Sequence, residues 1–222
     1  TIVASKPTIA QQLQTKYRFY GIKAEVANAS KDLGVSSTAG SHRSAAVVAQ
    51  RFVSARKRSQ KIQILARAEP KACRLYNTGA MPQALYGFEA FGLPPTSITD
   101  LTAMAHQTTC RNGGYGRCDV LDIALTIGIK YHPHVHCAFT QVKQWFKLLR
   151  QSRIDSIDFS KAFYSVRQKI LAASTENRWQ LVRGPMGATI ATVHQLGWNP
   201  ISLYKWVGGD PLIGGPWTWT SR

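Results

Sequence analysis

Residues 41–68 read SHRSAAVVAQRFVSARKRSQKIQILARA, a run without proline or glycine. Apolar or small residues recur along it at alternating spacings of four and three, which places them on one side of a helix: Val48, Phe52, Ala55, Ser59, Ile62 and Ala66. Pro70 ends the run. The pattern predicts one long helix that packs through a narrow stripe of small side chains.

Basic residues occupy most of the remaining surface of this helix. Their positions at 100° per residue place Arg43, Arg51, Lys57, Arg58 and Lys61 on one arc, and Arg56 and Arg67 on another flank. Acidic residues are absent from 41–68, so the like charges repel one another without compensating pairs. A phosphate backbone beside the helix explains this composition better than a solvated face does. We therefore expect all seven residues to hold nucleic-acid phosphates.

The charge of the whole chain limits the class of partner. Lys and Arg number 28 against 11 Asp and Glu, a net charge of +17, which is more than solubility requires. Nucleic acid and an anionic membrane surface both neutralise such a charge. No apolar run approaches the roughly 18 residues of a membrane span, and the 41–68 helix lacks the Trp, Phe and Leu clusters of helices that lie in lipid headgroups. The sequence favours nucleic acid and keeps a peripheral membrane protein as an alternative.

The remaining pattern is also helical. Periodicity and caps predict further helices at about 71–86, 96–108, 120–127, 133–150, 159–173 and 185–196. Aromatic residues on either side of the turn at 208–211 predict a small β-hairpin. We expect a mainly α, helical bundle-like domain with a small C-terminal β-hairpin. Its parts are a basic N-terminal arm at 1–30, a helical RNA-binding domain at 31–197 and an aromatic hairpin or tail at 198–222.

Two details of these helices can be compared directly with a structure. Thr96 or Ser97 is expected to cap the helix that follows Pro94-Pro95, with Asp100 in its first turn. The helix opened by Pro133 is expected to pack through residues spaced four, three, four and three apart: Val135, Phe139, Val142, Phe146 and Leu149.

Two more basic groups and several tryptophans complete the expected surface. Arg111 and Arg117 bracket a glycine-rich stretch that can bring backbone N–H groups close to a phosphate. Lys143 and Lys147 extend the charge of the 133–150 helix. The tryptophans at 179, 198, 206, 217 and 219 either stack on bases or, the more usual role, belong to the core.

Catalytic and metal-binding patterns are weak, and we expect no catalytic residue, cofactor or metal ligand. His132, His134 and His136 lie close together, but on a helix His134 and His136 point about 200° apart. The Asp119/Asp122 and Asp155/Asp158 pairs are explained by the preference for negative charge at helix N-termini. The four cysteines lack C-x-x-C spacing and indicate ordinary thiols in a reducing compartment.

Several short motifs resemble the region that follows the palm in reverse transcriptases of non-LTR retroelements, particularly those of dinoflagellates and related alveolates. The motifs are Lys31-Asp32-Leu33-Gly34-Val35, Thr38-Ala39-Gly40, LYNTGAMPQALYG at 75–87, Gly92-Leu93, Arg117-Cys118, Arg178-Trp179, Gly184-Pro185 and Leu196-Gly197-Trp198. The resemblance covers most of the chain from about Gly21. It implies the mostly helical thumb and connector, which hold the template–primer duplex. The palm's Ala-Asp-Asp turn has no match, so the resemblance implies nucleic-acid holding without polymerisation.

Two origins fit a thumb region without its palm. It is either a fragment of the retroelement protein or a fragment recruited as a non-catalytic, RNA-binding structural subunit of a ribonucleoprotein, such as an organellar ribosome. The charge excess favours recruitment, with structured RNA such as rRNA and other protein subunits as partners. Residues 1–24 lack acidic side chains, as organelle transit regions do; an arm that orders on RNA fits equally. We expect the mitochondrial matrix, with the nucleus as the alternative.

Overall fold

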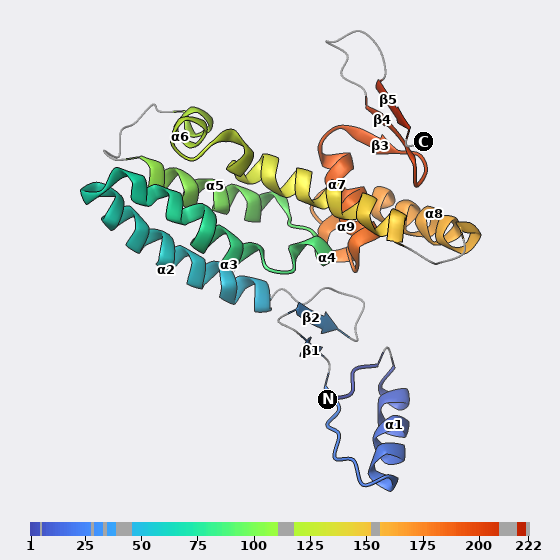
Figure 1. Cartoon of the computed structure of the whole chain (residues 1–222). Coiled ribbons are helices and arrows are strands. Elements are labelled where there is room, and N and C mark those ends of the chain that lie inside the picture. Colours follow the sequence, from blue (N-terminus) through green and yellow to red (C-terminus); the bar gives the residue numbers. More distant parts are fainter. Residues whose placement is uncertain are drawn as a thin grey trace.

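The computed structural model describes residues 1–4, 6–27, 29–32, 35–38, 46–110, 118–151, 156–208 and 217–220. The fold is mainly α-helical with a small antiparallel sheet near the C-terminus, as the sequence predicts. Figure 1 shows helices α2 to α9 in one elongated body, with α7 running from its green half into its orange half. Each half has its own hydrophobic core.

The N-terminal segment forms a small unit apart from the helical body (Figure 1). Helix α1 (Pro7–Phe19) begins with proline at its first turn, and Ile2 pairs with Val26 in an isolated parallel bridge that closes the segment on itself. Strands β1 (Ala29–Asp32) and β2 (Val35–Thr38) then pair antiparallel. The sequence reading predicted neither α1 nor this pair of strands.

The first core lies beneath α2 (Ala46–Ala68), which is the helix predicted from residues 41–68. Ala55, Ser59, Ile62 and Ala66 are buried, and Val48 and Phe52 pack against the same core, so the predicted stripe is confirmed. α2 packs against α5 (Pro95–Thr109), whose Leu101 and Met104 are fully buried. Short helix α4 (Phe88–Phe91) precedes α5, and α6 (Asp119–Thr126) covers its far end.

The single helix predicted at 71–86 is wrong in detail. The segment is helical but divides into a 3₁₀ turn η1 (Pro70–Arg74), a π-helical turn η2 (Tyr76–Ala80) and α3 (Met81–Leu85). Pro82 has no N–H to donate to the preceding turn, so a regular α-helix cannot run through it. The fully buried Tyr76 anchors the segment, because its hydroxyl donates to the Leu101 carbonyl oxygen at 2.8 Å.

The capping prediction for α5 is also wrong. The helix starts at Pro95 with Pro94 at its N-cap, so Thr96 and Ser97 lie inside the first turn and no side chain caps it. Asp100 lies beyond that first turn and forms an ion pair with Arg56 of α2. Proline at the first helical position removes one of the unpaired N–H groups, and the Ser97 N–H donates to the Pro94 carbonyl oxygen at 3.0 Å instead of to a capping side chain.

The second core is built around Trp145. Helices α7 (Pro133–Gln151), α8 (Ser156–Ala172) and α9 (Pro185–Gln195) surround it, and its ring stacks on Phe159 with centroids 5.9 Å apart. The 3₁₀ turn η3 (Ile129–Tyr131) leads from α6 into α7, and a second 3₁₀ turn, η4 (Arg178–Leu181), connects α8 to α9. Strands β3 (Trp198–Pro200), β4 (Lys205–Gly208) and β5 (Trp217–Thr220) form an antiparallel sheet in the order β3-β4-β5.

The predicted packing face of α7 needs correction. Its buried residues are Pro133, Cys137, Gln141 and Trp145, whereas Val135 and Phe139 are 44% and 67% exposed. The predicted stripe is right only for its second half, where Val142, Phe146 and Leu149 pack against the second core. Gln141 lies between the cores, and its amide nitrogen donates to the Glu89 carbonyl oxygen at 3.0 Å and the Thr189 hydroxyl at 3.4 Å.

Gly92 makes a second close contact between the two halves of the molecule, because it lies against Trp179 and Ala188 of the second core. Its φ of +65° is in the left-handed region, and an added Cβ would lie 2.7 Å from the Trp179 ring and 3.1 Å from Ala188 Cβ. We expect Gly92→Ala to lower the free energy of unfolding by about 1–3 kcal/mol more than Gly197→Ala in urea titrations. Gly197 is the matched control, because its φ is +82° and an added Cβ would meet nothing within 4 Å. Equal losses for the two variants would show that backbone strain alone acts at Gly92.

Candidate nucleic-acid interface

The solvent-facing side of α2 carries the predicted basic residues. Arg56, Lys57, Arg58, Lys61 and Arg67 are exposed, and Arg51 is half-buried. Among the described residues, Lys57, Lys61 and Arg67 have no hydrogen-bond or ion-pair partner. Their ammonium and guanidinium groups are therefore the cations of α2 that an external anion reaches without breaking an internal contact.

The other three arginines of α2 have internal contacts. Arg51 hydrogen-bonds the Tyr86 carbonyl oxygen and lies 4.9 Å from the centre of the Tyr86 ring. Arg58 donates to the Gly79 carbonyl oxygen at 3.2 Å, and Arg56 lies 3.5 Å from Asp100 in an ion pair that is half exposed on both sides. Such an exposed pair contributes about 0–1 kcal/mol at most. These arginines fasten α2 to its neighbours.

Apolar side chains interrupt the basic surface of α2, a feature the sequence reading missed. Val53, Ile64 and Leu65 are 55%, 66% and 53% exposed, beside Lys57 and Lys61. Exposed apolar groups among cations suit a partner that covers both, such as a folded nucleoprotein surface. The sequence alone could have indicated their exposure, because these three apolar residues lie outside the stripe of alternating four and three spacings that was predicted to be buried.

A second basic surface lies on α7. Lys143 and Lys147 are exposed one turn apart, and Arg150 and the exposed Phe139 share their face through spacings of three and four. An aromatic ring beside cations is the combination that stacks on unpaired bases. Because the sequence prediction placed Phe139 on the packing face of α7, it did not identify Phe139 as a candidate site residue. Because α5 packs against both α2 and α7, the two basic surfaces belong to one helical body.

Three predicted site residues, Arg43, Arg111 and Arg117, lie outside the described residues. The flanking Cys110 and Cys118 are described; they end α5 and begin α6 as the C-cap and the N-cap respectively.

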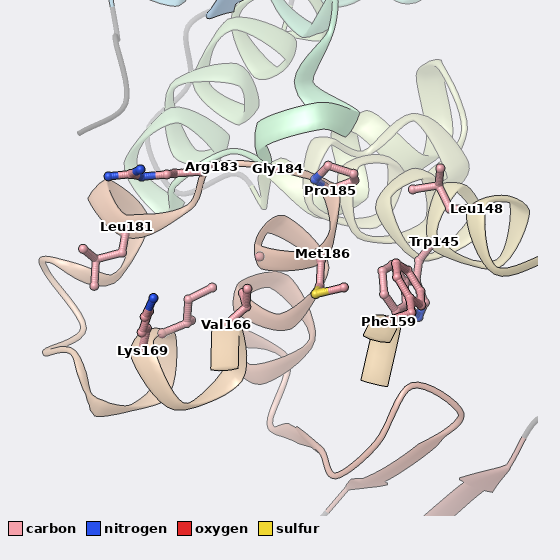
Figure 2. A pocket seen from close by; sticks show the side chains of 12 residues that line it. Trp145, Leu148, Phe159, Val166, Lys169, Leu181, Arg183, Gly184, Pro185 and Met186 are labelled. Atoms are coloured by element: carbon pink, nitrogen blue, oxygen red, sulfur yellow. The ribbon is translucent and has the colours of Figure 1, made fainter. Parts of the chain in front are cut away.

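The described tryptophan side chains serve the second core. Trp179 and Trp206 are buried, and Trp198 packs against the same cluster. A cavity of about 760 Å³ opens beside this core. Figure 2 shows its apolar lining, with Trp145 and Phe159 at one end and Lys169 and Arg183 at the other. Its apolar wall does not resemble a phosphate-binding groove.

The described carboxylates have simple electrostatic roles. Asp119 and Asp122 begin α6 and Asp158 begins α8, where the helix dipole favours negative charge. Asp158 also lies 3.7 Å from Lys161. Asp155 lies outside the described residues. The interpretation of the aspartates as helix-start charges is confirmed for these three.

The histidine cluster at 132–136 does not converge on a point. His132 is buried, His134 is exposed, and their ring centres lie 5.7 Å apart. Burial lowers the pKa of His132, helped by the nearby imidazole of His134, and burial likewise lowers the pKa of His136 and His194. Burial raises the pKa of the Cys137 thiol to about 12, so this thiol stays protonated. The shifts therefore favour the neutral forms of His132, His136, His194 and Cys137 at pH 7.

Within the described residues, no helix is long and apolar enough to cross a bilayer. Comparison of the chain with protein-family models, with curated proteins and with solved structures found no match.

The buried His132 gives a pH dependence. Its folded-state pKa lies below the ordinary value of about 6.5, so protonation favours the unfolded chain. Its contribution to stability is complete above about pH 6.5 and is lost as the pH falls. We expect the free energy of unfolding to decrease from pH 7 to pH 5 in urea titrations, and His132→Asn to make that decrease shallower. The variant and the parent should have parallel profiles between pH 7 and 8, and an unchanged slope below pH 7 would remove His132 as a cause.

Proposed function

We propose that the chain is a non-catalytic RNA-binding structural subunit of a ribonucleoprotein, such as an organellar ribosome. The observation that carries the proposal is the surface of α2, which has no acidic residue and holds Lys57, Lys61 and Arg67 exposed without described partners. A protein with a net charge of +17 that leaves these cations uncompensated gains most by binding a polyanion.

Binding is by phosphates rather than by sequence. Lysine and arginine on a helix surface release counterions from the nucleic-acid backbone, which supplies affinity without base readout. Lys143 and Lys147 of α7 add a second set of contacts, and Phe139 beside them supplies a ring for an unpaired base. Arg43, Arg111 and Arg117, which lie outside the described residues, are proposed as further phosphate contacts on the sequence pattern alone.

Other protein subunits are proposed to cover part of the surface. Exposed apolar side chains occur on α2 and also in the N-terminal segment. Those of the N-terminal segment are Ile9, Leu13, Tyr17, Phe19, Tyr20 and Ile22. Contiguous exposed apolar groups mark contact with other macromolecules. A large complex supplies both RNA and protein neighbours, and the proposed compartment is the mitochondrial matrix, with the nucleus as the alternative.

Two alternatives remain. The first is a nucleic-acid-holding thumb fragment of a non-LTR retroelement reverse transcriptase, and the long basic helix beside the LYNTGAMPQALYG motif supports it. The second is a peripheral protein of an anionic membrane, favoured by the exposed apolar residues of α1 beside Lys16 and Arg18. All three share the cationic surface and differ in the anion that covers it.

The deciding experiment is to purify the chain from its source at mild salt, sequence the RNA that accompanies it and measure the mass of the particle. Ribosomal RNA in a large particle would support the structural subunit. A retroelement transcript would support the thumb fragment instead. Absence of RNA, together with binding to vesicles of anionic lipid, would support the membrane protein and overturn the proposal.

The α2 surface has its own test. We expect the triple variant Lys57→Gln, Lys61→Gln and Arg67→Gln to weaken binding to a structured RNA and to reduce the slope of log Kd against log salt by about 2 to 3. The three side chains have no described internal contacts, so the fold should be unchanged by circular dichroism. A matched control, Lys161→Gln, Lys169→Gln and Lys205→Gln, removes the same charge from exposed positions elsewhere. An equal change in slope for both variants would mean that net charge alone, rather than α2, binds the RNA.

A further inference from the structure

The end of α5 and the beginning of α6 bring three potential metal ligands together. The ligand atoms of His106, Cys110 and Asp122 all lie within 4.8 Å of one another. His106 Nε2 and Asp122 Oδ2 are 3.1 Å apart, and all three residues are half-buried. Sequence reading missed this group, because its members come from two helices and the spacing resembles no common motif.

Local structure explains how the three side chains meet. His106 and Cys110 are four residues apart at the C-terminal end of α5, which places them on one face. The Cys110 N–H donates to the His106 carbonyl oxygen at 2.8 Å, so the last turn is closed. Asp122 lies on α6, directly before Ile123, which is fully buried in the first core. Packing of α6 on α5 therefore holds Asp122 opposite the other two residues.

The donor set matches a particular class of ion. A thiolate, an imidazole nitrogen and a carboxylate oxygen together suit Zn²⁺, whereas Mg²⁺ and Ca²⁺ prefer oxygen ligands alone. Tetrahedral zinc binds such atoms at about 2.0–2.3 Å, which places them about 3.3–3.8 Å from one another. The His106–Asp122 distance is already close to this range. The other two distances are at most 4.8 Å, and small rotations of the side chains would bring them into the range as well.

We propose that His106, Cys110 and Asp122 bind Zn²⁺ through three protein ligands, with water in the fourth position, and that the ion fastens α5 to α6. The hydrogen bond between His106 and Asp122 joins the same helices without metal. Cys110 takes no part in that hydrogen bond, so this residue separates the two accounts. Cys118 lies at the N-cap of α6 outside the group and is not a ligand in this proposal.

The test uses the full chain, stripped of metal under reducing conditions and titrated with Zn²⁺ against a chromophoric chelator. We expect saturable binding of one ion and a zinc-dependent rise in the urea midpoint. Co²⁺ in place of Zn²⁺ should give the ligand-field bands of a tetrahedral site and a thiolate-to-cobalt charge-transfer band.

Variants assign the ligands. Cys110→Ser, His106→Gln and Asp122→Asn should each lower Zn²⁺ affinity about tenfold or more, and Cys110→Ser should remove the charge-transfer band. Cys118→Ser and His134→Gln are matched controls that remove the same chemical groups outside the site, and they should bind as the parent does. Circular dichroism and the metal-free urea midpoint establish that each variant is folded.

Any of four results would overturn the proposal. One is the absence of saturable zinc binding in the folded parent chain. Another is a parent-like affinity in Cys110→Ser, which keeps the hydrogen bond between His106 and Asp122 intact. The third is an equal loss of affinity in Cys118→Ser, which would assign the ion to a different set of ligands. His106→Gln or Asp122→Asn that lowered only the metal-free midpoint would show a structural hydrogen bond and no metal site.

Discussion

One face of α7 connects the two halves of the molecule. Cys137 packs in the first core, Trp145 packs in the second, and Gln141 lies between them, four residues from each. A spacing of four places all three on the same side of a helix. The buried amide of Gln141 hydrogen-bonds α4 and α9 from this face, so the relative position of the two cores depends on it.

This division of each helix into buried and exposed faces also produces the proposed binding surface. α2 buries a narrow stripe made mostly of small residues such as Ala55 and Ser59, which leaves most of its circumference to solvent and allows cations around it. On α7 the buried face opposes Lys143 and Lys147. A surface built in this way offers charge over two helices rather than a shaped pocket, which suits RNA held by its backbone.

The sequence predicted the elements governed by local rules. The stripe of α2, the start of α7 at Pro133, the end of α9 before Gly197 and the pairing of β4 with β5 follow from periodicity, proline and glycine. Features that depend on distant partners were missed. The burial of Gln141 rather than Phe139 requires Glu89 and Thr189, and the convergence of His106 with Asp122 requires α5 to pack on α6. Of the candidate site, the charged residues of α2 were readable from sequence, and the apolar side chains among them were not recognised.

The shared helix has a consequence for synthesis and cooperativity. During translation α2 to α6 are made before α7, so the first core around Leu101 and Met104 stays incomplete until α7 has been made. The second core around Trp145 stays incomplete until α9 has been made. In the folded protein α7 contributes side chains to both cores, so disrupting the packing of one core also removes contacts from the other. We therefore expect the helical body to open and close as one cooperative unit despite having two centres of packing, and a break in the chain within α7 to leave two halves, each lacking a helix that it needs.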